Sequence, residues 1–179
     1  FIENMPLYEA SFPADKINAW LGEAYFCRAY YYFAMVNRYG AVPLVKEVKN
    51  YPETSIEELQ IPRNTQQEGW DFIAEDLDKA IELLPEESLM RGRVNKYVAY
   101  GLKSRAMLYA ASLCLFDTPV SGYEELLGMP ASKAQSYYQA AYDAASKLDG
   151  KYSLYNKHTD KFENYWNLFL DEDNPEVIF

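Results

Sequence analysis

Catalytic chemistry has few candidate residues in this sequence. His158 is the single histidine among 179 residues, so neither a histidine-based triad nor a metal site with several histidine ligands can be built. Its neighbours Lys157 and Thr159 indicate a surface loop. No glycine-rich loop follows a predicted strand, which leaves nucleotide phosphates without a cradle. Carboxylates are abundant, but no spacing singles out the pair that glycosidic cleavage requires, and we expect no catalytic residue, metal site or cofactor.

The two cysteines, Cys27 and Cys114, lie inside predicted helices. Two thiols are too few for a disulfide scaffold, and their spacing matches no metal-binding motif. We expect both to be buried free thiols, with a bridge between packed helices as the alternative.

Aromatic side chains are the residues best suited to binding a ligand. They make up 16% of the sequence, and most are tyrosines. Flat aromatic faces stack on sugar rings, although the same side chains often fill the core between helices. The aromatic residues of predicted loops are the visible candidates for a sugar site: Tyr123, Tyr155, Tyr165 and Trp166. Burial is the alternative for each, and Trp166 in particular is expected to close the end of a helical stack.

The net charge of −10 excludes two classes of partner. Nucleic acid requires a basic surface, and anionic lipid attracts basic segments rather than acidic ones. The acidic run at 75–82 is expected to be a solvated helix face and not a cation site.

Two arginines, Arg28 and Arg105, lie on apolar faces of predicted helices. An unpaired charge is costly to bury, so we predict that each pairs with a carboxylate or caps the carbonyl groups of a neighbouring helix. The alternative is that each side chain reaches water along its own stem.

The elements that position these residues begin with a long helix. Asp15 is its expected N-cap, Gly40 lies just past its end, and Pro43 prevents continuation. Apolar and aromatic residues recur at helical spacing along one stripe that also includes an arginine: Leu21, Tyr25, Arg28, Tyr32 and Val36. Four aromatic residues in a row at 30–33 add apolar surface on other sides, so we expect this helix to be packed on more than one side.

Three further helices are expected over about 65–84, 95–116 and 132–148. Thr65 and Glu68 form a capping box, as do Ser132 and Gln135, and Asn95 is a third candidate cap. The segments between them are polar or rich in proline, and we expect loops at 45–62, with at most one helical turn near 55–59, and at 117–130. Residues 1–13 are expected to be a loop or the tail of an earlier element. From residue 151 the chain is predicted to be mostly irregular, and 175–179 to begin a strand.

No stretch is apolar and long enough to cross a bilayer, and no signal peptide or lipid-attachment cysteine stands near residue 1. The sequence starts at Phe1 instead of a methionine. We expect residues 1–179 to form one helical domain that is a fragment of a larger protein.

The first helix and the turn after it carry a specific pattern. It runs as Glu23-Ala24-x-x-x-Arg28-Ala29-x-x-Tyr32-Phe33-x-x-Val36-x-x-Tyr39-Gly40-x-Val42-Pro43-Leu44 and resembles the signature of the SusD/RagB family. The family resemblance covers nearly all of this sequence but only about the middle third of a typical member. Leu21-Gly22-x-x-Tyr25 is also similar to the start of a tetratricopeptide helix, although the helix spacing departs from a 34-residue repeat.

The resemblance implies an all-α fold of tetratricopeptide-like stacked helical hairpins, with four main helices, a right-handed superhelical twist and little or no sheet. It implies a surface-exposed outer-membrane lipoprotein that binds a glycan or oligosaccharide and delivers it to a SusC-like TonB-dependent transporter. Its lipid anchor and much of its glycan site would lie outside this segment. The alternatives are a tetratricopeptide-like adaptor that binds protein, and a helical glycosidase with a carboxylate pair facing a cleft.

Overall fold

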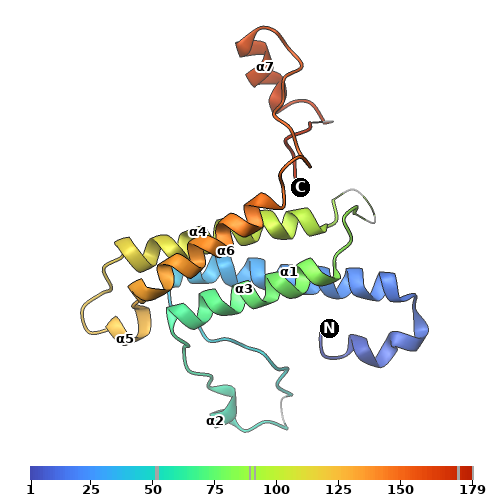
Figure 1. The fold of residues 1–179 in the computed structure, drawn as a ribbon. Helices are drawn as coiled ribbons and strands as arrows, with labels where there is room; N and C mark the ends of the chain where they lie inside the picture. Colours follow the sequence, from blue (N-terminus) through green and yellow to red (C-terminus); the bar gives the residue numbers. More distant parts are fainter. Residues whose placement is uncertain (51–52, 89, 91, 173, 179) are drawn as a thin grey trace.

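The computed structural model describes residues 1–50, 53–88, 90, 92–172 and 174–178. The regular elements among these residues are all helices, and none of the described residues forms a strand. Four long helices make up the body of the molecule: α1 (Ala14–Tyr39), α3 (Gln66–Leu83), α4 (Lys96–Phe116) and α6 (Ala134–Ser146). α1 packs against α3, α3 against α4, and α4 against α6. Consecutive long helices run in opposite directions (Figure 1), which confirms the predicted all-α fold of stacked helical hairpins.

Five shorter elements connect or flank these helices. They are the 3-10 helices η1 (Met5–Ser11) and η2 (Ala131–Lys133) and the short helices α2 (Ile56–Leu59), α5 (Glu124–Leu127) and α7 (Lys161–Leu168). α2 lies at the tip of the long connection between α1 and α3, and α7 stands away from the four long helices on a projecting C-terminal arm (Figure 1). We define this arm as residues 151–178.

Local capping signals place most helix ends. The Thr65 hydroxyl accepts the N–H of Glu68 at 3.1 Å, and the Glu68 carboxylate accepts the N–H of Thr65 at 2.8 Å, so the predicted capping box starts α3. Asn95 accepts two N–H groups of the first turn of α4. Gly40 has a positive φ of 69° and donates to Val36 O at 2.8 Å, which ends α1.

The predicted start of α1 is wrong. The helix begins at Ala14, directly after Pro13, whose ring holds φ at −59°. Asp15 therefore lies in the first turn, where its carboxylate favours the helix dipole without capping an N–H group.

The predicted capping box at the fourth helix is also wrong. Pro130 leads into the 3-10 turn η2, so Ser132 lies inside that turn and α6 starts two residues later with no side-chain cap.

The C-terminal arm is more regular than the sequence predicted. Asp160 caps α7 by accepting the N–H of Glu163 at 2.9 Å. Residues 175–178 form a turn and irregular backbone, so the predicted strand is absent from them, and Phe179 lies outside the described residues. The segment 117–130, expected to be a loop, contains α5, and residues 1–13 contain η1.

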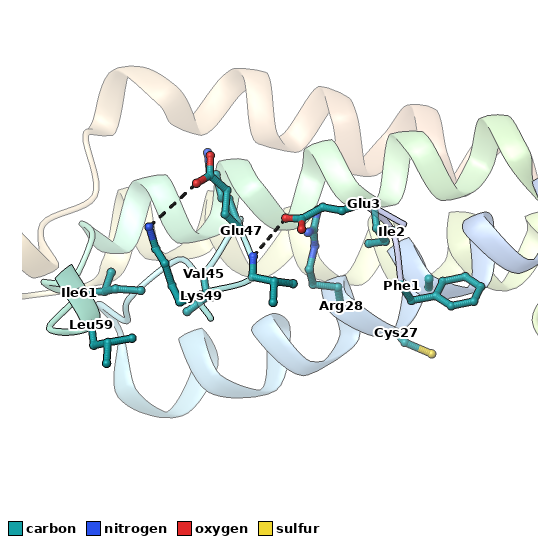
Figure 2. A pocket seen from close by; sticks show the side chains of 13 residues that line it. Phe1, Ile2, Glu3, Cys27, Arg28, Val45, Glu47, Lys49, Leu59 and Ile61 are labelled. Carbon is teal, nitrogen blue, oxygen red and sulfur yellow. Dashed lines mark hydrogen bonds and ion pairs between the residues drawn. The ribbon is translucent and has the colours of Figure 1, made fainter. Parts of the chain in front are cut away.

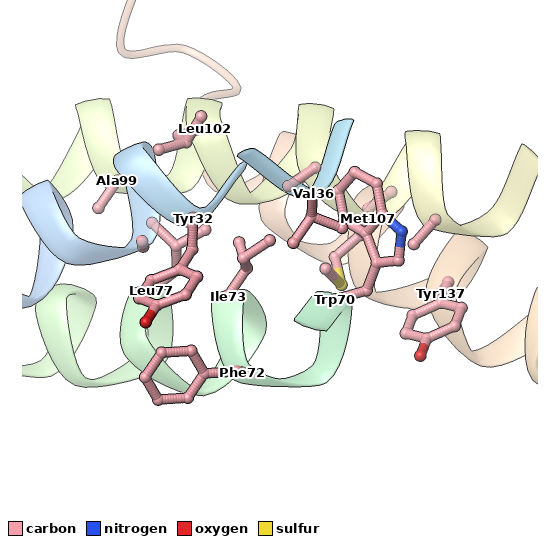
Figure 3. Packing of buried hydrophobic residues seen from close by; sticks show 14 of the residues in the cluster. Tyr32, Val36, Trp70, Phe72, Ile73, Leu77, Ala99, Leu102, Met107 and Tyr137 are labelled. Carbon is pink, nitrogen blue, oxygen red and sulfur yellow. The ribbon is translucent and has the colours of Figure 1, made fainter. Parts of the chain in front are cut away.

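The core lies between α1, α3 and α4, where Trp70, Ile73 and Leu77 of α3 are fully buried (Figure 3). Two glycines let α1 and α3 approach closely. A Cβ atom on Gly22 would lie 2.8 Å from Leu84 Cγ, and one on Gly69 would lie 2.9 Å from a methyl group of Val36. Small residues at these two positions therefore set the distance between the two helices.

α1 contacts more than one neighbouring element, as predicted, but part of its surface is left uncovered. It packs mainly on α3 and touches α4 only briefly. Tyr32 is buried, and its hydroxyl accepts the N–H of Val45 at 2.8 Å, which holds the segment after α1 in place. Tyr30, Tyr31 and Tyr39 are exposed. Consecutive residues of a helix point in different directions, so α3 can cover only some of these aromatic side chains.

Candidate functional site

Arg28 and Asp76 form a bidentate ion pair between α1 and α3. Arg28 Nε donates to Asp76 Oδ2 at 2.7 Å and its Nη2 donates to Oδ1 at 2.8 Å. The Asp76 side chain is 1% exposed, and the guanidinium carbon lies 4.9 Å from the centre of the Phe72 ring. The hydrogen bonds to Asp76 raise the pKa of Arg28. The predicted pairing of Arg28 is confirmed, and Asp76 is a buried partner instead of part of a solvated acidic face.

Arg105 behaves differently, although the sequence around it resembles that around Arg28. Its side chain is exposed, and no carboxylate partner lies near it in the described part of the chain. The prediction that it pairs is therefore wrong, because its position on α4 faces water. A pair that the sequence did not indicate joins Arg93 to Glu23 across 70 residues.

Both cysteines are free thiols, but only Cys114 is buried. Cys27 is exposed on α1, which corrects the expectation that it is buried. Burial raises the pKa of each thiol, and Glu23 adds to the shift at Cys27. Neither environment favours the thiolate form that nucleophilic chemistry requires.

The four aromatic candidates for a sugar site lie in two separate regions. Tyr123 directly precedes α5 and is 53% exposed. The other three lie on the C-terminal arm, where Tyr165 and Trp166 of α7 are 66% and 58% exposed and Tyr155 is 4% exposed. Trp166 therefore does not close the end of the helical stack, because α7 projects away from it (Figure 1).

Tyr155 anchors the arm. Its hydroxyl donates to Asp171 Oδ2 at 2.6 Å, its N–H donates to Glu176 at 2.7 Å, and its carbonyl accepts Asn164 Nδ2 at 2.9 Å. Burial, together with the bond to Asp171, raises the pKa of Tyr155 to about 12. The same hydrogen bond lowers the pKa of Asp171. Since its ring and hydroxyl are both engaged, Tyr155 supports the arm and offers no free face to a ligand.

α7 presents an exposed aromatic face. The rings of Phe162 and Trp166 stack with centres 6.3 Å apart, and those of Tyr165 and Phe169 meet edge to face at 5.3 Å. All four side chains are exposed. Their spacing of three and four residues was visible in the sequence and would have predicted this helix.

Two larger cavities flank α1. One of about 600 Å³ lies between residues 1–3, α1 and residues 45–49, with Arg28 and Cys27 in its wall (Figure 2). Its two carboxylates are engaged: Glu3 accepts the N–H of Val48 at 3.2 Å, and Glu47 lies 4.0 Å from Lys49.

The second cavity, of about 770 Å³, lies between α1 and α4 and is largely apolar. Its single carboxylate, Glu23, is paired with Arg93. In the part of the chain that the structure describes, no three metal-binding side chains cluster. No helix there has the length and apolar character needed to cross a membrane.

Known proteins resemble this chain in sequence and in fold. A SusD-like family model, described as "Starch-binding associating with outer membrane", matches residues 6–108. A SusD-like protein of Formosa agariphila is 30% identical over 102 residues, which are 56% of this chain and 18% of that protein. The crystal structure of a SusD-like protein from Bacteroides fragilis is 29% identical, with a TM-score of 0.71, over 99% of this chain and 30% of that one.

The same fold is found in a laminarin-binding SusD-like protein, which is 20% identical with a TM-score of 0.63. That match covers 96% of this chain and 32% of the other. The chain thus spans less than a fifth of the length of the Formosa agariphila relative and less than a third of the length of each of these two solved structures.

Proposed function

Because this chain belongs to the family of SusD-like proteins, we propose that it is a helical domain of a receptor that binds a glycan at the outer-membrane surface. The observation that carries this proposal is the family match, which runs from η1 into α4 and so covers all of α1 and α3 and the first part of α4. A laminarin-binding protein with the same fold adds support. We propose that the chemistry is binding without cleavage, in keeping with the description of the matching family model as starch-binding.

The exposed aromatic face of α7 is the surface that we assign to the glycan on this domain. Tyr165 and Trp166 offer flat rings on a short helix whose position is fixed by the Tyr155–Asp171 hydrogen bond. Rings held in place lose little freedom when a sugar stacks on them, which favours binding. Tyr123, beside α5, is the second exposed candidate.

Affinity electrophoresis in gels containing starch, laminarin or xyloglucan tests the proposal. We expect at least one of these glycans to retard the protein. Trp166→Ala should weaken the apparent affinity by about 5- to 150-fold, if stacking of a sugar on the ring is worth about 1–3 kcal/mol, the value for a nucleic-acid base on an aromatic side chain. Phe116→Ala is the matched control, because Phe116 is also an exposed aromatic residue but lies at the end of α4. Retardation by none of the three glycans would contradict the proposal.

We further propose that the receptor is a surface lipoprotein that passes its glycan to a SusC-like TonB-dependent transporter. Tyr30 and Tyr31 make the outer face of α1 aromatic and exposed, and such residues are common at protein interfaces. The same face would serve a tetratricopeptide-like adaptor with a different partner. Purification from detergent-solubilised outer membranes separates the two: recovery of a TonB-dependent transporter supports the hand-off, and its absence from the purified complex counts against it.

A further inference from the structure

At one end of the helical stack α1 and α4 end and α3 begins, beside α5 (Figure 1). The residues at this end line a small cavity. Its volume is about 270 Å³, which is the space of about nine water molecules in the liquid. Polar side chains line it from three parts of the chain: Asn37 and Tyr39 of α1, Gln66 of α3, and Asp117 and Thr118 after α4. Val36, Leu113 and Leu127 supply apolar surface.

Gln66 is the informative residue in this cavity. It is only 6% exposed, and its amide group makes no hydrogen bond with any described residue. Among the described residues, Trp70 Nε1 is the only side-chain nitrogen or oxygen that is both fully shielded and without a partner. The amide atoms of Gln66 are therefore not fully shielded, and they are accessible from the cavity that Gln66 lines. By contrast, the adjacent Gln67 donates to Asp71 at 3.3 Å. An amide that has no partner in the described chain and opens into a cavity is free to exchange hydrogen bonds with whatever occupies that cavity, water or a ligand.

Gly40 shapes the wall next to this amide. Its φ of 69° favours glycine, and a Cβ atom there would lie 2.7 Å from Leu127 Cδ2 and 3.3 Å from Gln66 Oε1. The backbone after α1 can therefore approach both side chains only because no side chain intervenes.

We propose that this cavity binds one neutral monosaccharide unit of a glycan. The amides of Asn37 and Gln66 each donate and accept, which matches hydroxyl groups that do both. Tyr39 is exposed at the rim and provides a flat ring for the sugar face. Asp117 is the single charged side chain in the lining, so it accepts from hydroxyl groups and repels an acidic sugar.

The choice of ligand class rests on the proposed function, but the site itself rests on Gln66 and its cavity. Crystals of the protein soaked separately in glucose, galactose, mannose, xylose and glucuronate test it directly. We expect density for at least one neutral sugar with a hydroxyl group within hydrogen-bond distance of the Gln66 amide, and none for glucuronate. A cavity that holds only water in every soak would overturn the inference.

Variants provide the test in solution. Gln66→Leu keeps the volume of the side chain and removes the amide, and we expect it to weaken binding of the sugar by about tenfold. The variant should unfold at the same temperature as the wild type or a higher one, because the amide makes no hydrogen bond with the described chain that the substitution could break. Gln135→Leu, on an exposed position of α6, is the matched control and should leave both quantities unchanged.

The possible failures are distinguishable. If sugars bind the protein but occupy only the aromatic face of α7, or if Gln66→Leu binds them as the wild type does, the cavity is not a sugar site and the proposed function stands. A lower unfolding temperature for Gln66→Leu would show that the amide stabilises the fold, which also counts against the inference. If no sugar or glycan binds anywhere, the proposed function and the inference both fail.

Discussion

The ion pair between Arg28 and Asp76 joins α1 to α3 at a point where the carboxylate is almost fully shielded from water. Two hydrogen bonds and the ring of Phe72 surround the guanidinium group. Removing one partner of such a pair costs more than the pair itself contributes, because the other charge stays buried without compensation. The pair therefore belongs to the framework of the stack and not to a ligand site.

Replacing Arg28 with Met tests this role. We expect Arg28→Met to lower the free energy of unfolding by about 3 kcal/mol in urea titrations, the lower end of the range for a broken buried pair, because Arg28 is partly exposed. Arg28→Met combined with Asp76→Leu should recover most of the loss, since no charge then remains buried.

Arg105→Met is the matched control for this experiment. Arg105 is exposed and unpaired in the described chain, so its replacement should change stability by less than about 0.5 kcal/mol. An Arg28→Met variant that is as stable as Arg105→Met would show that the buried pair contributes nothing.

Sequence patterns identified Arg28 as a side chain in need of a partner, but not which partner it has. Asp76 lies four residues after Phe72 and three after Ile73, and so on the buried face of α3. That spacing was readable, yet the surrounding acidic residues made the whole run resemble a solvated surface. Arg105 shows the converse: the same local sequence lines the open cavity between α1 and α4, and the side chain stays exposed.

Helix ends were predictable where the signal is local. Thr65, Glu68, Asn95 and Gly40 act through bonds within one turn, so the sequence alone defines them. The predicted cap at Ser132 is wrong because a 3-10 turn follows Pro130 and includes Ser132. The aromatic spacing of α7 and its cap, Asp160, are local signals of the same kind, but a helix of 8 residues in a segment without other helical patterns is hard to distinguish from irregular chain.

The capping box of α3 makes stability depend on pH. The hydrogen bonds from Thr65 lower the pKa of Glu68 from 4.5, so the folded state favours the carboxylate. This contribution is complete above the unfolded pKa of 4.5 and is lost as the pH falls through the lower folded pKa.

We expect Thr65→Ala to lower the free energy of unfolding by about 1 kcal/mol at pH 7. Because the variant lacks the hydroxyl that stabilises the carboxylate, its stability should fall less steeply than that of the wild type as the pH drops below 4.5. Parallel slopes for the two proteins in acid unfolding titrations would argue against the capping box.

Close contact between α1 and α3 gives a third test. Gly22→Ala places a methyl group 2.8 Å from Leu84 Cγ and 3.1 Å from the Leu84 backbone nitrogen, and we expect a loss of about 1–2 kcal/mol from overpacking. Gly101→Ala in α4 is the control, since its nearest neighbour is Ile178 Cδ1 at 3.9 Å. That variant should be neutral or more stable, because alanine favours the helix.

On the scale of the whole molecule, the helical stack and the C-terminal arm have different roles. The stack buries its apolar residues between α1, α3 and α4, whereas the arm holds an aromatic helix away from it through polar contacts around Tyr155. The stacked fold and the SusD-like signature were evident from the sequence. The internal structure of the arm was not, because it depends on hydrogen bonds between residues 16 and 21 positions apart.

Recovery of the bound ligand tests the central claim, that the protein binds a glycan without cleaving it. The protein is incubated with oligosaccharides of a glycan that retards it in affinity electrophoresis. The complex is then isolated, and the ligand is released and measured by mass spectrometry. We predict that the oligosaccharide is recovered intact and at its original length after prolonged incubation. Shortened products that accumulate with time and protein concentration would contradict a binding protein and identify a glycosidase.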